Sequence, residues 1–249
     1  MKYIRGFVMS VGMFTIMPVP FKSWNEKYSH LVIPSLPIVG VLVGSIWFAL
    51  AYLLTLTTIP TLMLASSILF LPYIITGFIH VDGFMDTTDA VYSRRDLEEK
   101  KRILKDSRTG AFAVIFMIGI VLLQFSAVYT ILDAGYSIMI FVFLPAVSRC
   151  VAGITMLNIK PIFETGYNVT FKENTRPSHT VFICVILCLL QISAWFVLGF
   201  AMLPLLVEVI VGVLLVAYLY KQFKGISGDL CGFIIVVSEL AALLTMACL

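Results

Sequence analysis

Charged residues are scarce in this chain. Asp, Glu, Lys and Arg make up 12% of its 249 residues, whereas 60% are apolar, and the mean hydropathy is +1.03. Soluble domains carry about 25% charged residues, so this composition excludes an ordinary soluble protein. The net charge is only +3 and the basic residues are confined to a few segments, so we expect no nucleic-acid partner.

Cysteine pairs with the spacing of a metal site are absent. The five cysteines are odd in number, show no C-x-x-C spacing and lie in or beside apolar blocks: Cys150, Cys184, Cys188, Cys231 and Cys248. We interpret them as small buried side chains in a reducing compartment, which excludes a disulfide framework and a cysteine-ligated metal. Internal repeats, low-complexity tracts and a separate soluble domain are also absent, so residues 1–249 are expected to form a single membrane domain.

A cleavable signal peptide is not expected either. Lys2 and Arg5 precede an apolar run to Met17, but Pro18 and Pro20 follow where a small-residue cleavage site would stand. We therefore expect this segment to be retained. Residues 4–17 are too few to cross a hydrocarbon layer of about 30 Å, and we expect them to form a re-entrant or interfacial helix.

Long apolar runs are what the chain does contain. They predict an all-α, polytopic bundle of about seven transmembrane helices, at roughly 31–54, 61–79, 111–132, 137–157, 180–200, 204–220 and 229–248. Within the first run, Gly40 and Gly44 are four residues apart, a spacing that favours close packing of two helices.

The basic residues predict the orientation of this bundle. The links at 22–30, 80–109, 158–178 and 221–226 alternate with the others along the chain and hold 14 of the 17 Lys and Arg residues. The links near 55–60, 133–136 and 201–204 hold none. By the positive-inside rule, we expect a multi-pass protein of the cytoplasmic membrane, with the basic links in the cytoplasm.

The charged segment 76–110 is the predicted catalytic segment. Asp82, Asp86 and Asp89 are spaced i, i+4, i+7, which puts three carboxylates on one face of a helix about two turns long. Their mutual repulsion is usually compensated by a hard divalent cation, so we expect these three aspartates to bind Mg²⁺ or Mn²⁺. The alternative is a solvated acidic helix end with no ligand.

Further polar residues of this segment are candidates for the same site. His80 is either a ligand, a hydrogen-bond partner of a phosphate or a structural residue, and Gly83 leaves room for a ligand or a turn. Lys105, Ser107 and Arg108 lie just before an apolar run and offer donors to a phosphate. The alternative for them is a positive-inside anchor, against which Asp106 argues. The intervening run 94–102 has alternating charges and is expected to be a solvated linker helix.

Charges inside apolar blocks form a second group of candidates. Arg149 lies within the 137–157 run, whereas Asp229 and Glu239 belong to the last run. A charge in the bilayer costs about 2.5 to 3.5 kcal/mol on insertion scales, so each needs a partner or a wet cavity. Arg149 is a candidate phosphate ligand, and Asp229, Glu239 and Asp106 of the preceding loop are further polar site candidates. Glu208 is embedded too, without a motif around it.

Several motifs together resemble one enzyme family. They are F-T-I-M-P-V-P (14–20), P-I-V-G-V-L-V-G (37–44), G-F-I-H-V-D-G-F-M-D-T-T-D (77–89), I-L-K-D-S-R-T-G-A-F (103–112), L-P-A-V-S-R (144–149) and G-I-S-G-D-L-C-G (225–232). This order resembles the cobalamin synthase, or adenosylcobinamide-GDP ribazoletransferase, family over nearly the whole chain. Phe78 and Ala90 depart from the family's pattern, which has glycines there.

The resemblance implies a membrane phosphotransferase of the last stage of cobalamin biosynthesis. Such an enzyme joins adenosylcobinamide-GDP to α-ribazole or its 5′-phosphate, releases GMP and requires Mg²⁺. Our mechanistic hypothesis for this reaction gives the catalytic roles to His80, Asp82, Asp86 and Asp89. The phosphates would be held by Lys105, Ser107, Arg108 and Arg149. The partners would be these substrates and the lipid bilayer, with a homo-oligomer or contacts to other cobalamin-assembly enzymes left open.

Two other functions fit parts of the pattern. CDP-alcohol phosphotransferases and polyprenyl transferases also place aspartates at the ends of membrane helices, but the first carry an A-R after D-G and the second carry two dense aspartate motifs. A transporter or divalent-cation channel would line its path with Arg149, Asp229 and Glu239. The clustering of carboxylates at one membrane face argues against it.

Overall fold

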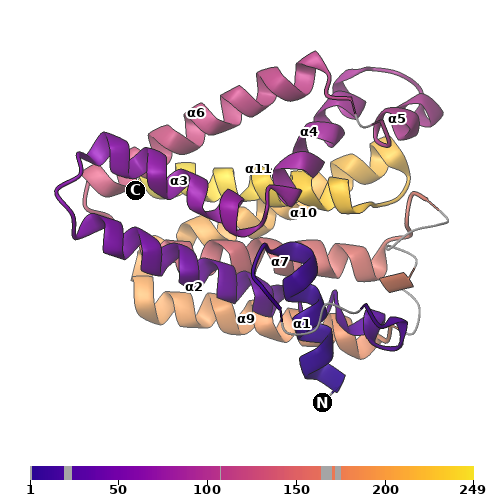
Figure 1. The fold of residues 1–249 in the computed structure, drawn as a ribbon, viewed down its shortest axis with the longest axis horizontal. Helices are drawn as coiled ribbons and strands as arrows, with labels where there is room; N and C mark the ends of the chain where they lie inside the picture. Colours follow the sequence, from indigo (N-terminus) through magenta and orange to yellow (C-terminus); the bar gives the residue numbers. More distant parts are fainter. Residues whose placement is uncertain (1, 20–23, 107, 164–169, 172–174) are drawn as a thin grey trace.

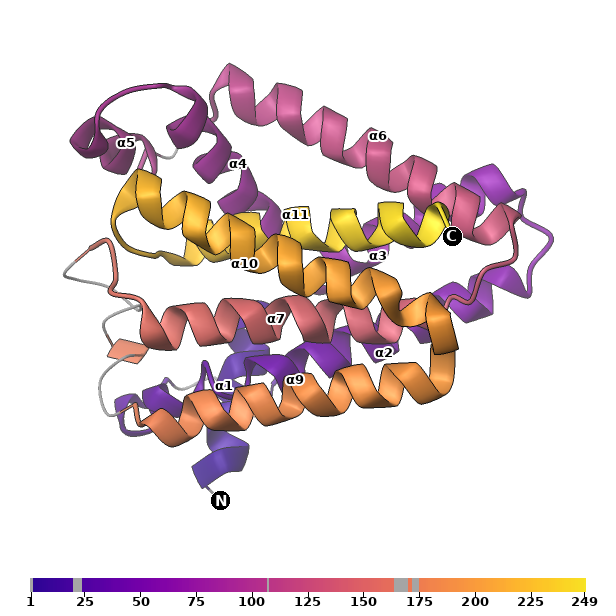
Figure 2. The ribbon, with the colours of Figure 1, turned by 180° about the vertical axis from the view of Figure 1, so that it is seen from behind.

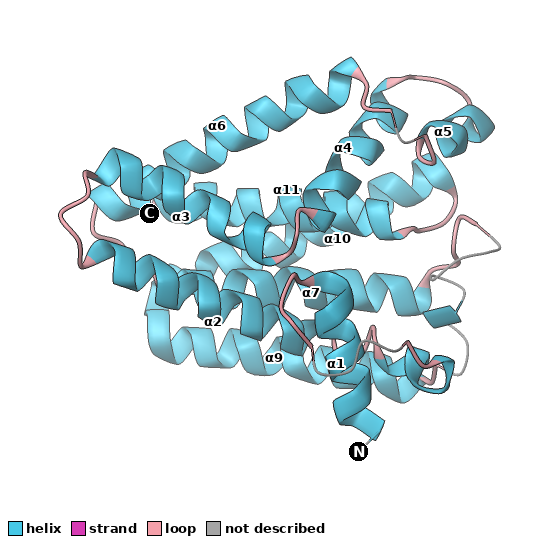
Figure 3. Cartoon of the chain, in the orientation of Figure 1, coloured by secondary structure: helices cyan, strands magenta, loops and turns pink. Residues whose placement is uncertain are grey.

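The computed structural model describes residues 2–19, 24–106, 108–163, 170–171 and 175–249. Regular structure in these ranges is helical, apart from one isolated bridge between Pro161 and Ile226 (Figure 3). The helices are α1 (Lys2–Phe14), η1 (Glu26–Leu31), α2 (Leu36–Thr55), α3 (Thr61–Ile75), α4 (Ile79–Tyr92), α5 (Leu97–Ile103), α6 (Ala111–Asp133), α7 (Ile140–Asn158), α9 (Pro177–Leu198), η2 (Gly199–Met202), α10 (Leu203–Phe223) and α11 (Gly228–Ala247). The predicted all-α class is confirmed.

The long helices lie side by side along the longest axis of the molecule (Figure 1). Five helical stretches of the described chain are long and apolar enough to cross a membrane, or six if α3 and α4 together form one broken span. One of the five, Pro177–Phe223, has 47 residues and contains both α9 and α10, which fold back on each other at η2 (Figure 2). Counting these two separately gives the predicted number of about seven.

α7 lies at the centre of the bundle, and α2 packs closely along it. A Cβ atom on Gly40 would lie 2.4 Å from the carbonyl oxygen of Pro145, and one on Gly44 would lie 2.3 Å from that of Val142. Because no real side chain fits in so little space, only glycine lets the two backbones approach this closely. The packing predicted from the spacing of these glycines is confirmed.

The chain turns sharply between α3 and α4. The sequence predicts one apolar helix from 61 to 79, whereas α3 ends at Ile75 and α4 leaves it at an angle of 90°. Gly77 and Phe78 have φ values of +61° and +62°, in the left-handed region that ends a helix. The predicted single span is therefore wrong at its end, and the aspartate-bearing helix packs into the bundle against α6 and α11.

Phe78 carries backbone strain at this turn. A left-handed conformation costs a non-glycine residue about 1 to 2 kcal/mol, and the Phe78 side chain is half exposed, with a tilted contact to Tyr73. We expect Phe78→Gly to leave thermal stability in detergent unchanged or to raise it by up to about 1 kcal/mol. The neighbouring Ile79→Gly, in an ordinary helical conformation, should lower it by about 1 kcal/mol. Equal destabilisation by both changes would contradict this account of the turn.

α1 lies across the bundle and does not run along it (Figure 1). Its 13 residues rise about 20 Å, which is less than the hydrocarbon thickness, and it is not among the candidate spans. The prediction of a re-entrant or interfacial helix therefore remains open. The described parts of the four basic links lie toward one end of the molecule, to which α5 and the α10–α11 turn also belong.

Candidate active site

α4 and α11 meet backbone to backbone near this end of the bundle. A Cβ atom on Gly83 would lie 2.7 Å from Cα of Asp229, and one on Gly232 would lie 2.9 Å from the carbonyl oxygen of His80. Side chains at either position would force the helices apart, so the crossing depends on both glycines. It puts the acidic face of α4 beside the first turn of α11.

Carboxylates from both helices gather at this crossing. α4 is helical from Ile79 to Tyr92, so Asp82, Asp86 and Asp89 share one face as predicted. The negative charges of Asp82, Asp229 and Asp89 all act on the Asp86 carboxylate. Asp82 is exposed and the other three are partly buried. The structure thus brings Asp229 to the predicted trio from a segment 140 residues later.

The donor chemistry of this cluster fits a hard divalent cation. Within the described ranges, no three His, Cys, Asp or Glu side chains are gathered closely enough to hold a metal ion by themselves. Mg²⁺ does not need such a cage, because it is usually held by one or two carboxylates while water and substrate phosphates complete its shell. Asp82 and Asp86, with Asp229 across the crossing, can supply these carboxylates.

Asp89 is engaged differently from its neighbours. Its Oδ2 accepts a hydrogen bond from the N–H of Gly110 at 2.6 Å, and its Oδ1 accepts one from the N–H of Ala113 at 2.9 Å. These N–H groups belong to the first turn of α6, where the helix itself offers no acceptor and its dipole favours a negative charge. Asp89 therefore ties the start of α6 to α4. Its role as a metal ligand stays a prediction.

The two roles of Asp89 are separable by substitution. Asn keeps one oxygen for the helix end, so we expect Asp89→Asn to cost about 1 kcal/mol of stability and to lower activity less than tenfold. Asp89→Ala, which removes both acceptors, should cost up to about 2 kcal/mol. Thermal unfolding and turnover of both variants would be measured together. Complete loss of turnover in a stably folded Asp89→Asn would instead indicate a direct role in catalysis.

The basic loop before α6 is exposed and lightly held. Arg108 makes an ion pair of 2.7 Å with Asp106, and this contact lowers the pKa of Asp106 to about 2. Nζ of Lys105 lies 4.0 Å from the ring centroid of Phe163. Ser107, the remaining predicted phosphate ligand, lies outside the described residues. Lys105 and Arg108 can therefore turn toward an incoming anion without opening a buried contact.

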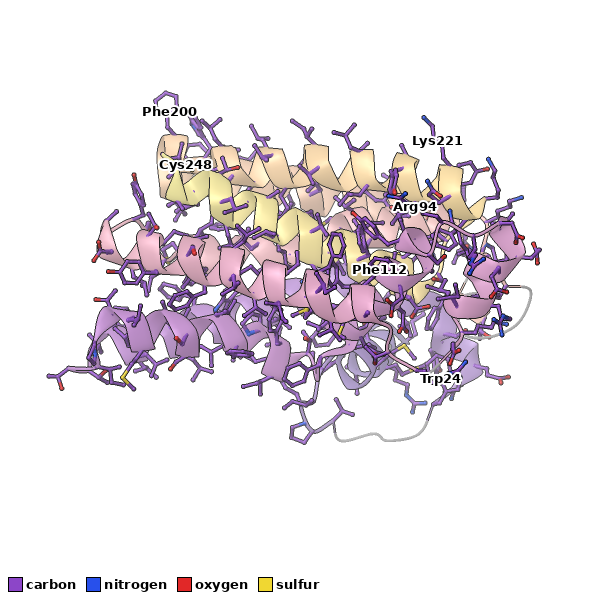
Figure 4. The ribbon with its side chains drawn as sticks, turned by 90° about the horizontal axis from the view of Figure 1, so that it is seen from above. Trp24, Arg94, Phe112, Phe200, Lys221 and Cys248 are labelled. Carbon is purple, nitrogen blue, oxygen red and sulfur yellow. The ribbon has the colours of Figure 1, made fainter. Side chains whose placement is uncertain are left out.

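Figure 4 shows where the loop lies. Arg94 and Phe112, which mark the two ends of the connection from α4 to α6, lie toward the same end of the molecule, opposite Phe200 and Cys248. The hydrogen bonds of Asp89 to the start of α6 fix this arrangement. The predicted phosphate-binding loop and the predicted carboxylate face are thus neighbours, although α5 separates them in sequence.

His80 lies on the inner side of the crossing. Its ring is buried and stacks on Phe14 of α1 with 6.4 Å between ring centroids. Its Nε2 has no hydrogen-bond partner among the described residues, and the charge of Arg149 acts on it. A buried ring nitrogen without a partner leaves a donor or acceptor available to a ligand. A purely structural role for His80 therefore does not explain this nitrogen.

Arg149 and Glu239 are paired with each other in the core. Nη1 of Arg149 lies 2.6 Å from Oε1 of Glu239, and the same oxygen accepts a hydrogen bond of 2.6 Å from the Ser148 hydroxyl. Arg149 is 2% exposed. A substrate phosphate would reach this guanidinium only after the pair separates, so the predicted phosphate contact would have to compete with an existing one.

Comparison with known proteins decides between the enzyme families. Residues 6–247 match the family described as cobalamin-5-phosphate synthase. The chain belongs to this family. It is 39% identical to the adenosylcobinamide-GDP ribazoletransferase of Clostridium botulinum (strain Alaska E43 / Type E3), over 98% of this chain and 97% of the relative. It is 32% identical to the enzyme of that name from Clostridium perfringens (strain ATCC 13124), over 98% of both chains. No solved structure gives a significant match.

A cobalamin-5-phosphate synthase is an enzyme of cobalamin synthesis, and the chain is accordingly a transferase. Several polar contacts inside the bundle were not predicted from the sequence. The Tyr73 hydroxyl donates to Oε1 of Gln124, joining α3 to α6. Glu208 is fully buried, and the charges of Arg149 and Glu239 act on it. Single polar residues in apolar runs are the signal that could have found them, but nothing in the sequence pairs them.

Proposed function

We propose that the chain transfers the adenosylcobinamide phosphate group from adenosylcobinamide-GDP to α-ribazole or α-ribazole 5′-phosphate. The products would be adenosylcobalamin, or its 5′-phosphate, and GMP. The observation that carries this proposal is the match over nearly the full chain to relatives named for this activity. The α4–α11 crossing supports it, because acidic side chains for a cation lie next to a loop with basic side chains for a pyrophosphate.

The reaction requires one bond to form and one to break at phosphorus. A ribose hydroxyl of α-ribazole attacks the phosphorus on the corrinoid side of the pyrophosphate, and the bond from that phosphorus to the oxygen of the leaving GMP breaks. The hydroxyl proton passes to a carboxylate of the α4 face acting as general base. Lys105 and Arg108 hold the pyrophosphate oxygens, since guanidinium and ammonium groups bind phosphate through charged hydrogen bonds.

We assign the cation to Asp82, Asp86 and Asp229, with Asp89 positioning the loop. Bound Mg²⁺ or Mn²⁺ would supply positive charge that offsets the negative charge of the leaving phosphate. The carboxylates that hold the cation keep it in position, and one carboxylate of the α4 face takes up the proton of the attacking hydroxyl. Partial burial of Asp86 and Asp229 makes these two carboxylates act more strongly on one another than they would in water.

We place the site at the cytoplasmic face of the cell membrane. In the sequence, alternate links hold 14 of the 17 basic residues, and the described parts of these links lie at the end of the bundle that carries the α4–α6 loop. This asymmetry follows the positive-inside rule. Nucleotide substrates are available on that side. Single cysteines would be introduced in the α5 region of a variant whose five native cysteines are replaced by serine, and their accessibility to a membrane-impermeant reagent would test the orientation. Labelling of these cysteines from outside intact cells would contradict it.

The central experiment is an assay of the purified full-length protein for cobalamin formation. We expect turnover from adenosylcobinamide-GDP and α-ribazole with Mg²⁺, loss of at least 99% of it with excess EDTA, and recovery on adding Mg²⁺ or Mn²⁺. CDP-alcohol and prenyl diphosphate donors serve as controls. Turnover that is insensitive to EDTA would contradict the cation, and turnover with either control donor alone would contradict the proposed substrates.

A further inference from the structure

A large cavity lies at some distance from the carboxylates. Its volume is about 830 Å³, within the range of about 300 to 1,000 Å³ typical of small-molecule sites, and it is enclosed by α1, η1 and the first turns of α2 and α9. α1 links the two regions, because Phe14 at its end stacks on His80 whereas Lys2 at its start lines the cavity. Twelve residues of helix separate these points by about 18 Å.

The polar side of this cavity is basic. Three cationic side chains line it, Lys2, Lys27 and Arg176, and no carboxylate is among the described lining residues. None of the three makes an ion pair to a described carboxylate. A cluster of cations gathered from three separate segments of the chain, without carboxylate partners among the described residues, attracts a negatively charged ligand.

Two histidines extend the basic side. His30 of η1 and His179 of α9 stack with 6.0 Å between ring centroids. Burial, followed by the charges of Arg176 and Lys2, lowers the pKa of His30. Neutral imidazoles at neutral pH can still donate one hydrogen bond each to an anion. The 22-residue helix α9 also begins here, so the positive end of its dipole favours an anion at this side of the cavity.

The opposite side of the cavity is apolar and continues onto the outer surface of the bundle. Phe7 and Leu31 form its inner part, whereas Ile38 of α2 and Phe182 of α9 are 41% and 45% exposed. Beyond Phe182, the face of α9 presents further apolar side chains to the surroundings. A ligand that fills this cavity therefore needs an anionic head and an apolar part that can lie against α2 and α9.

We propose that this cavity binds the phosphate group of an amphiphile, with Lys2, Lys27 and Arg176 holding the phosphate and the apolar part lying between α2 and α9. A phospholipid of the surrounding bilayer and a soluble phosphate ester are two sources of the same chemistry. The open apolar side and its continuity with the membrane-facing surface favour the phospholipid. The site goes beyond the transferase activity and does not depend on it.

Binding of short-chain lipids to the purified full chain tests the proposal. Native mass spectrometry would count bound dioctanoyl-phosphatidylglycerol across a concentration series, with dioctanoylglycerol as the phosphate-free probe. We expect one tightly bound phosphatidylglycerol, and about tenfold or more weaker binding to the double variant Lys27→Gln/Arg176→Gln. The single variant Lys27→Gln, which changes an exposed side chain, should also weaken binding of phosphatidylglycerol, but by a smaller factor.

The matched control is Arg95→Gln/Lys221→Gln, which removes the same charge elsewhere at this end of the molecule. Lys221 and Trp24, two residues before η1, lie at opposite edges of this end in Figure 4. The control should bind phosphatidylglycerol like the wild type. Thermal unfolding verifies that each variant is folded. If the Gln double variant does not fold, the charge-preserving variant Lys27→Arg/Arg176→Lys is measured in its place and should retain binding.

Each outcome decides the matter. Equal affinity of wild type and the Lys27→Gln variants overturns the site, and so does dioctanoylglycerol binding as tightly as phosphatidylglycerol. If inorganic phosphate or GMP displaces the bound lipid at lower concentrations than added phosphatidylglycerol does, the phosphate site is supported. Its ligand is then a soluble phosphate ester. Displacement only by anionic lipid supports the site and assigns it to the bilayer.

Discussion

Replacing Asp86 by asparagine is expected to lower the rate of cobalamin formation by about a thousandfold or more. Asp86 stands at the centre of the acidic cluster, where the charges of Asp82, Asp89 and Asp229 act on it. If Asp86 holds the cation as proposed, removal of its charge withdraws several kcal/mol of stabilisation from the transition state, and about 4 kcal/mol corresponds to a factor of a thousand. Turnover of the purified variant at saturating Mg²⁺ measures the effect.

The control for this variant is Asp133→Asn. Asp133 is an exposed aspartate at the last residue of α6, at the opposite end of the bundle, so its loss removes the same charge without touching the crossing. It should keep wild-type turnover. Asp86→Glu should recover part of the activity at higher Mg²⁺ concentrations, because the charge is kept and only its position shifts. Normal turnover in a folded Asp86→Asn would remove the cluster from the mechanism.

Arg149→Met is expected to destabilise the fold by about 3 to 5 kcal/mol. The change leaves Glu239 and Glu208 buried without the cation that faces them, and uncompensated buried charge is among the costliest of single substitutions. Cooperative thermal unfolding in detergent would show a lower midpoint, or the variant would fail to accumulate in membranes. This expectation differs from that for a surface phosphate ligand, whose loss would raise KM at unchanged stability.

A second substitution separates these explanations. The double variant Arg149→Met/Glu239→Met replaces the ion pair by apolar groups of similar volume and should recover much of the lost stability. Ser148 would then lose its acceptor as well, which costs about 1 kcal/mol. A single Arg149→Met that unfolds like the wild type but needs far more substrate would contradict the structural role and favour the phosphate contact predicted from the sequence.

Most of the helices could be predicted from the sequence because length and hydropathy determine them. The runs at 111–132 and 229–248 agree with α6 and α11 to within a residue or two at each end. The end of α3 could not, because Gly77 and Phe78 interrupt an apolar pattern that itself continues to Ile79. Hydropathy indicates which segments are soluble in the bilayer. It contains no signal for a left-handed turn at a residue other than glycine.

The candidate site was predictable along α4 and not across helices. The spacing of Asp82, Asp86 and Asp89 is a local property of one helix, whereas the approach of Asp229 depends on how two helices cross. The pairing of Arg149 with Glu239 is likewise a tertiary contact between residues 90 positions apart. Both residues were recognised as costly charges in an apolar setting, but the same reasoning could not say that each would be the other's partner.

The two sides of the candidate site differ in rigidity. The glycine contact between α4 and α11 makes one side rigid, whereas the side formed by the loop before α6 can adapt. On the rigid side, the main chain of α4 rests on the main chain of α11 at Gly83, so the separation between the Cα atoms of Asp82 and Asp229 is fixed by the backbone. On the adaptable side, Lys105 contacts the ring of Phe163 and Arg108 pairs with Asp106 at the protein surface. Substrate binding is therefore expected to move the side chains of Lys105 and Arg108, while the main-chain spacing of the α4–α11 crossing stays the same.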